Sequence, residues 1–188
     1  MSEPFHSAQD NLNERFFAEI DKQLLADLRE DLQHEQESRA LAAATGLVDT
    51  ELLEELVALK VSPETLAAFR LVPMVAVAWS DRKIERAERD VLMDAAAREG
   101  IKRGSPAWRL LEQWLVRQPS PQLLHAWTEY TEEICKSLSS NAIKVLKAEV
   151  IGQAEMVAQA AGGLLGLGAV SKAEKETLAV IRKAFPNH

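Results

Sequence analysis

Apolar residues recur along this chain with the period of a helix, and no stretch shows the alternation that is typical of a strand. The clearest row has one apolar residue at every fourth position: Phe16, Ile20, Leu24, Leu28 and Leu32. It predicts a long first helix that begins near Leu12 and ends at Gly46. Because the row lasts only about three heptads, we expect this helix to pack on the rest of the chain rather than to form a coiled coil.

Serine followed by proline marks several of the later helix starts, since serine caps a helix and proline suits its first position. The pairs are Ser62-Pro63, Ser105-Pro106 and Ser120-Pro121. Residues 66–79 are apolar on nearly every side, which predicts a central helix that Pro73 kinks or splits near Leu71. The pattern predicts an all-α protein of about eight helices in antiparallel hairpins. We expect residues 1–60 to form an N-terminal helical extension and residues 61–188 to form the main helical domain.

Two parts of the chain resemble each other. Residues 74–78 (MVAVA) match residues 156–160 (MVAQA), and residues 84–90 match residues 170–176 in their order of apolar and charged positions. The second unit is four residues longer, and the insertion falls in the glycine-rich residues 162–168. The match predicts a duplicated helix–loop–helix unit.

Three carboxylates come together in sequence at the loop of the first unit. Asp81 lies on the predicted turn, while Glu85 and Glu88 lie in the first turn of the next helix. Residues three apart share a helix face, so these acids are candidate ligands for one divalent cation. The alternative is purely structural, because acids in a first helical turn also cap the helix and interact favourably with its dipole.

Composition and charge exclude several classes of function. The 188 residues carry a net charge of −7 with no stretch rich in Lys or Arg, which argues against nucleic-acid binding. The single cysteine, Cys135, excludes an intramolecular disulfide and fits a reducing compartment. The longest uncharged stretch, residues 156–171, is too short to span a membrane. Residues 1–17 lack the layout of a signal peptide, so we expect a cytoplasmic protein.

Residues 78–84 (AWSDRKI), followed by Glu88, resemble the Ala-x-x-Asp-Gly-x-Ile…Glu signature of the tellurite-resistance TerB-like family. Residues 162–168 (GGLLGLG), followed by Val170-Ser171 and Glu174, are similar to the second half of proteins in that superfamily. The resemblance covers residues 62–186. It implies an all-α fold of two related halves, acidic loops proposed to bind metal, and a role in metal-stress responses without catalysis.

The resemblance carries over to Asp81 and Glu88 only. Arg82 stands where the family prefers glycine, and a cation beside Asp81 competes with a metal for its carboxylate.

Two functions from different classes follow. The first is a non-catalytic interaction module that binds a protein partner or a second copy of itself, with a divalent cation at Asp81, Glu85 and Glu88. The alternative is a metal-dependent hydrolase that uses the same three acids, with Asp94 or Glu174 as a further ligand or base. A concave pocket around the acids would favour the enzyme.

Overall fold

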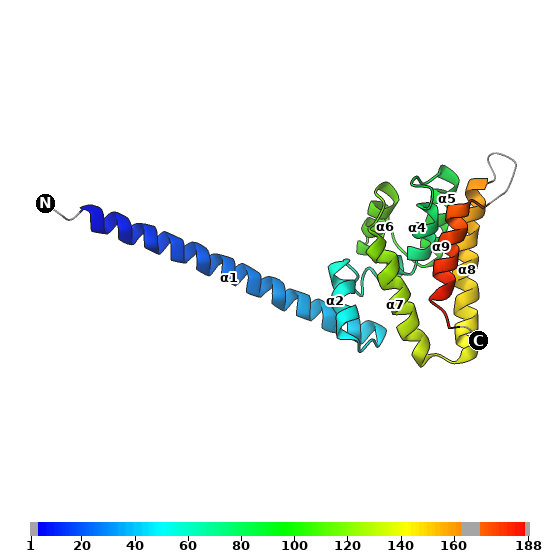
Figure 1. Cartoon of the computed structure of the whole chain (residues 1–188), viewed down its shortest axis with the longest axis horizontal. Coiled ribbons are helices and arrows are strands. Elements are labelled where there is room, and N and C mark those ends of the chain that lie inside the picture. Colours follow the sequence, from blue (N-terminus) through cyan, green and yellow to red (C-terminus); the bar gives the residue numbers. More distant parts are fainter. Residues whose placement is uncertain (1–3, 163–169, 187–188) are drawn as a thin grey trace.

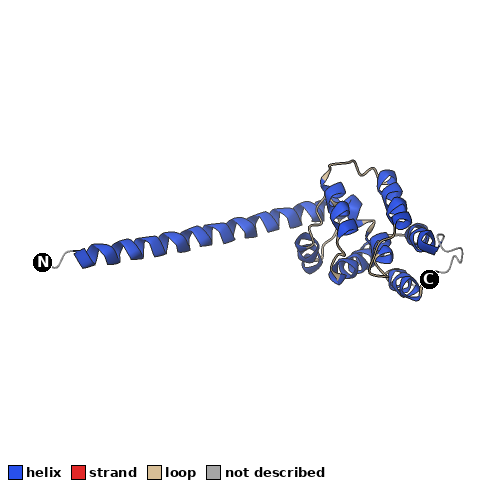
Figure 2. Ribbon diagram, turned by 90° about the horizontal axis from the view of Figure 1, so that it is seen from above, coloured by secondary structure: helices blue, strands red, loops and turns tan. Residues whose placement is uncertain are grey.

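The computed structural model describes residues 4–162 and 170–186, with side chains for residues 22–160 and 170–186. The described residues contain helices and no strand, which confirms the all-α prediction (Figures 1 and 2). The helices are α1 (Pro4–Thr45), α2 (Thr50–Ala58), α3 (Leu66–Phe69), α4 (Val72–Ala78), α5 (Arg86–Arg98), α6 (Pro106–Val116), α7 (Pro121–Ser137), α8 (Ser140–Gly162) and α9 (Lys172–Lys183).

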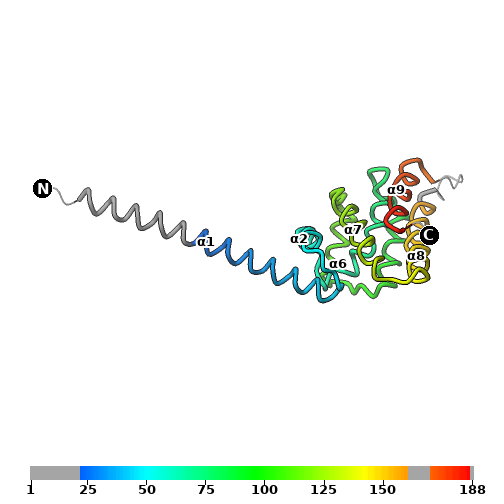
Figure 3. The backbone as a smooth tube through the Cα atoms, turned by 60° about the horizontal axis from the view of Figure 1, so that its bottom comes forward, coloured from blue at the N-terminus to red at the C-terminus, as the bar shows by residue number. Residues whose placement is uncertain are grey.

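The helix α1 extends away from the other helices, which together form a compact head (α2 to α9; Figures 1 and 3). It packs against α2 at its C-terminal end, where Leu41 is fully buried. Gly46 ends the helix with a positive φ of 77°, as predicted. The expectation that the leucine row of α1 packs on the domain is wrong. Leu24, Leu28 and Leu32 are about half exposed, whereas Leu41, near the end of α1, is fully buried. Phe16 and Ile20 of the predicted row lie outside the described side chains.

The short helix α4 lies at the centre of the head and packs against α5, α7, α8 and α9. Six of its seven residues are buried, as its uniformly apolar sequence predicts. The predicted split near Leu71 is present, since α3 ends at Phe69 and α4 begins at Val72 with Pro73 in its first turn.

Most helix starts follow the predicted signals, and one does not. The Ser105 hydroxyl accepts a hydrogen bond from the Trp108 N–H, and Ser171 caps α9 in the same way. Ser62-Pro63 instead forms a turn in which the Ser62 N–H donates to Thr65 Oγ1, and α3 begins only at Leu66. The Thr65 hydroxyl also donates to the Lys60 carbonyl, so its side chain stabilises this turn and does not cap α3.

The hydrophobic core of the head begins before the predicted domain boundary. Leu41, Leu47, Leu53 and Leu56 belong to the same core cluster as α4. The division at residue 60 stays a prediction, but residues 41–61 contribute buried side chains to the head. The insertion was predicted within residues 162–168, and all of these except Gly162 lie outside the described residues.

Candidate functional site

The acidic loop of the first unit joins α4 to α5. Arg82 adopts a left-handed backbone with φ of 64°, and its N–H donates to the Trp79 carbonyl at 2.9 Å. The indole N–H of Trp79 donates to the Trp114 carbonyl at 2.7 Å, which anchors the loop to α6. The left-handed turn explains why glycine would suit position 82.

Glu85 and Glu88 form a capping box at the start of α5. The Glu85 N–H donates to Glu88 Oε2 at 2.7 Å, while the Glu85 side chain accepts from the backbone N–H of Glu88. Lys83 Nζ also approaches Glu85 Oε1 at 3.3 Å. The Glu88 side chain is only 3% exposed. These two acids therefore act as helix caps, the structural alternative to a metal site.

The second unit repeats this arrangement at the start of α9. The Ser171 N–H donates to Glu174 Oε2 at 2.6 Å, and the Glu174 N–H donates to Ser171 Oγ at 3.2 Å. The Glu174 side chain is 3% exposed, as Glu88 is. Serine replaces Glu85 at the capping position, as the sequence match indicated.

The two units meet at these helix starts. The Ser80 and Thr177 hydroxyls lie 2.9 Å apart in a hydrogen bond between the units. The Ser171 hydroxyl donates to Asp81 Oδ1 at 3.4 Å. We call this set of side chains the junction: Ser80, Asp81, Glu85, Glu88, Ser171, Glu174 and Thr177. Ser80 and Thr177 were missed by sequence reasoning, since no local pattern indicates that they pair across 97 positions.

Burial and neighbouring negative charges both raise the pKa of Glu88. Burial raises the pKa of Glu88 to about 7, and the hydrogen bond from the Glu85 backbone only partly offsets that rise. The negative charges of Glu174, Glu85 and Asp81 raise it further. The neighbouring acids therefore lie close enough to disfavour the ionisation of Glu88.

The predicted metal ligands are near one another but do not form a ligand cluster. Within the described residues, no group of three or more His, Cys, Asp or Glu side chains is placed to hold a metal ion. Asp81 is exposed, while Glu85 and Glu88 direct oxygens to backbone N–H groups. The metal site at these three residues stays a prediction.

A cavity of about 360 Å³ adjoins the junction. Its apolar wall includes Val72 and Leu123, and its polar edge includes Ser80, Arg82 and Thr177. None of the three predicted metal ligands lines this cavity. It is therefore not the concave acidic pocket that the hydrolase alternative requires.

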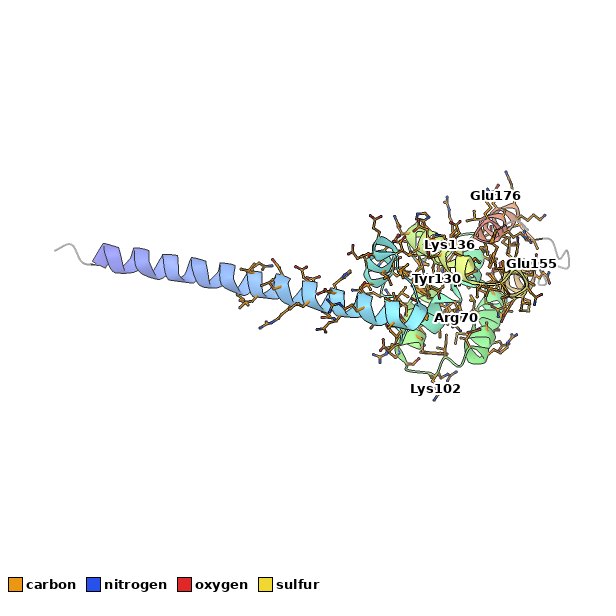
Figure 4. All side chains as sticks on the ribbon, turned by 90° about the horizontal axis from the view of Figure 1, so that it is seen from below. Arg70, Lys102, Tyr130, Lys136, Glu155 and Glu176 are labelled. Carbon is orange, nitrogen blue, oxygen red and sulfur yellow. The ribbon has the colours of Figure 1, made fainter. Side chains whose placement is uncertain are left out.

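A second candidate surface lies on α1, and we call it the leucine face: Leu24, Leu25, Leu28 and Leu32. Leu24 is 55% exposed, Leu28 48% and Leu32 56%. The described side chains of this part of α1 extend into solvent, away from the labelled residues Arg70 and Tyr130 of the head (Figure 4). Four leucines exposed together on one helix are typical of a surface that another molecule covers.

Cys135 and three of the tryptophans have ordinary structural roles. Cys135 is buried, as expected of a small packed residue, and burial raises the pKa of its thiol. Trp114 and Trp127 are in the core, and Trp108 is half-buried with the Arg103 guanidinium over its ring.

Comparison with family models, with curated proteins and with solved structures finds no match to this chain. Among the described residues, no helix has the length and apolar character needed to cross a membrane.

Proposed function

We propose that this chain is a non-catalytic, TerB-like interaction module, in which α1 presents its leucine face to a protein and the head anchors α1. The observation that carries the proposal is the exposure of Leu24, Leu28 and Leu32, between 48% and 56%, on a helix that leaves the head. Apolar residues on an exposed helix face are the usual anchors when one helix binds another protein.

The head supports this proposal through its rigidity. Side chains cap the starts of α2, α5, α6 and α9. The core runs from Leu41 to Phe185, and no buried side-chain nitrogen or oxygen among the described residues lacks a partner. A TerB-like domain would consist of two related halves that pack together. Here α4 packs against α8 and α9, and α5 packs against α8, which supports that arrangement. In this proposal the junction joins the halves and has no catalytic role.

A photoreactive amino acid placed at Leu28 tests the proposal in the cells that make the protein. Irradiation should give a covalent adduct with a protein. The matched control carries the same amino acid at Ala26, which lies about 160° around α1 from Leu28 at 100° per residue. An adduct at both positions, or at neither, would contradict the role of the leucine face.

One observation favours a second candidate, divalent cation binding at the junction in a metal-stress setting. Burial contributes most to the raised pKa of Glu88, and the negative charges of Glu174, Glu85 and Asp81 raise it further, so a cation placed among these acids would relieve that repulsion. A thermal melt of chelator-stripped protein with Mg²⁺, Ca²⁺, Mn²⁺ or Zn²⁺ tests this. A rise in Tm that Asp81→Ala together with Glu88→Gln removes would support it, and an unchanged Tm with every ion would reject it.

A further inference from the structure

The leucine face has the geometry of a helix-packing ridge. Leu24, Leu28 and Leu32 are spaced four apart and so form one row of the kind that packs into the grooves of a second helix. When both helices use such rows, their axes cross at about 50° and lie roughly 8–10 Å apart. Leu25 widens the row next to Leu28, and it is 52% exposed.

The helix needs a partner for its own stability. Packing on α2 buries Leu41 but leaves the leucine face about half exposed. The described side-chain contacts within this part of α1 are local pairs, such as Gln23 with Asp27 and Gln33 with Glu37. Pairs four residues apart stabilise a helix only slightly, and most helical stability in proteins comes from packing of an amphipathic face.

We propose, on the basis of the function proposed above, that the molecule covering the leucine face is a second copy of this chain. Two α1 helices cross at Leu28 about a two-fold axis. Leu28 lies midway in the described part of the row, with Leu24 four positions before it and Leu32 four positions after it. The same ridge therefore serves both copies, as a two-fold contact requires.

Charge selects the relative direction of the two helices. Asp27 and Arg29 flank Leu28, about 100° to either side of it. If the two helices run in the same general direction, the two-fold axis brings Arg29 of each copy opposite Asp27 of the other. If they run in opposite directions, Arg29 meets Arg29 and Asp27 meets Asp27. The pairing of opposite charges favours the first arrangement.

The net charge of α1 favours a crossed pair over a long coiled coil. The described stretch carries more acidic than basic side chains: Asp27, Glu30, Asp31, Glu35 and Glu37 against Lys22, Arg29 and Arg39. Helices that diverge from one crossing point keep most of these acids apart, whereas helices paired along their whole length would place like charges together. Divergence also separates the two heads, which follow the C-terminal ends of α1.

Analytical ultracentrifugation of the full chain over a wide concentration range tests this proposal. We expect a reversible change from 20.8 kDa to twice that mass. Leu28→Gln should weaken the dimer by about tenfold or more, because it removes the residue at the crossing. The matched control Ala26→Gln, on the opposite side of α1, should leave the dissociation constant unchanged. Because Leu28 is exposed, its substitution should leave the head folded. A thermal melt of the head that matches the wild type would verify this.

Charge exchange tests the direction of the helices. Asp27→Arg alone and Arg29→Asp alone should each weaken the dimer by a few-fold, because each places like charges together. The double variant Asp27→Arg/Arg29→Asp should return the dissociation constant to near the wild-type value.

Three results would overturn the proposal: a constant mass of 20.8 kDa, a dimer that Leu28→Gln leaves intact, or a double variant that is no tighter than the single ones. A monomer whose Leu28 photoadduct contains a different protein would overturn self-association, yet it would leave the proposed function standing.

Discussion

Leucines in α1 and in the head have similar spacing but opposite environments. Leu52, Leu53 and Leu56 of α2 recur at helical intervals and are at most 6% exposed. Leu24, Leu28 and Leu32 of α1 recur just as regularly and are about half exposed. Periodicity therefore predicts which face of a helix seeks burial, but it does not say whether the covering surface belongs to the same molecule.

Truncation should give the largest difference between the leucine face of α1 and the core of the head. Removing residues 1–38 takes away the leucine face and leaves the buried Leu41 in place, so we expect cooperative melting of the head to persist. Removing residues 1–60 also takes Leu47, Leu53 and Leu56 out of the core, and we expect cooperative melting to be lost. Circular dichroism during heating checks both. A cooperative melt without residues 1–60 would show that the domain begins where the sequence alone predicted.

Single leucine truncations should reproduce the contrast on a smaller scale. Leu56→Ala should lower the free energy of unfolding of the head by about 2–5 kcal/mol, because Leu56 is fully buried. Leu28→Ala should change it by less than about 0.5 kcal/mol, because the head does not contact Leu28. Urea titration of dilute protein measures both values. A comparable loss in the two variants would mean that α1 and the head unfold as one unit.

The free energy of unfolding of the head should depend on pH because of Glu88. The pKa of Glu88 is raised to about 7 in the folded protein from an ordinary value of 4.5, so folding favours the protonated carboxyl. That stabilisation is complete below the ordinary pKa and is lost as pH rises through about 7. We expect the free energy of unfolding to fall by about 3 kcal/mol between these limits.

Glu88→Gln should remove most of this pH dependence, since an amide cannot ionise but still accepts the Glu85 N–H. The control Asp94→Asn changes an exposed carboxylate on the same helix, and it should keep the wild-type profile. The free energy of unfolding of both variants and of the wild type, measured from pH 4.5 to pH 8, gives the comparison. A profile that Glu88→Gln leaves intact would assign the effect to another group.

The smallest predicted effect is a gain in stability. Arg82 has φ of 64°, a conformation that costs a residue with a Cβ about 1 kcal/mol. Arg82→Gly should therefore raise the free energy of unfolding of the head by about 0.5–1 kcal/mol. Arg82→Ala removes the cation but keeps the strained conformation, so it should give no gain. Equal gains in both variants would trace the effect to charge rather than to the backbone.

Local chemistry made much of the fold predictable. The Ser105-Pro106 and Ser171–Glu174 signals mark helix starts that the structure contains, and Gly46 and Gly100 end helices with positive φ. These signals act within one turn of the chain and can be recognised without knowledge of the tertiary fold. Ser62-Pro63 failed because Thr65 binds the Ser62 N–H and postpones the helix to Leu66.

The candidate site was less predictable because it depends on contacts between distant residues. The sequence placed Asp81, Glu85 and Glu88 near one another, and the structure adds that Glu85 and Glu88 are committed to a capping box. The bond between Ser80 and Thr177 joins residues 97 positions apart, which no local pattern encodes. The fate of the leucine face was misjudged for a related reason, since the row itself contains no sign of what covers it.

Hydrogen–deuterium exchange of the full chain at two concentrations tests the central claim most directly, because it observes α1 and the head in one sample. At high concentration, we expect the amides of residues 22–38 to be protected by the covered leucine face. On dilution they should exchange rapidly, because an unpartnered helix is marginal in water, while α4 stays protected at both concentrations. Equal protection of residues 22–38 at both concentrations, or none at either, would contradict the account.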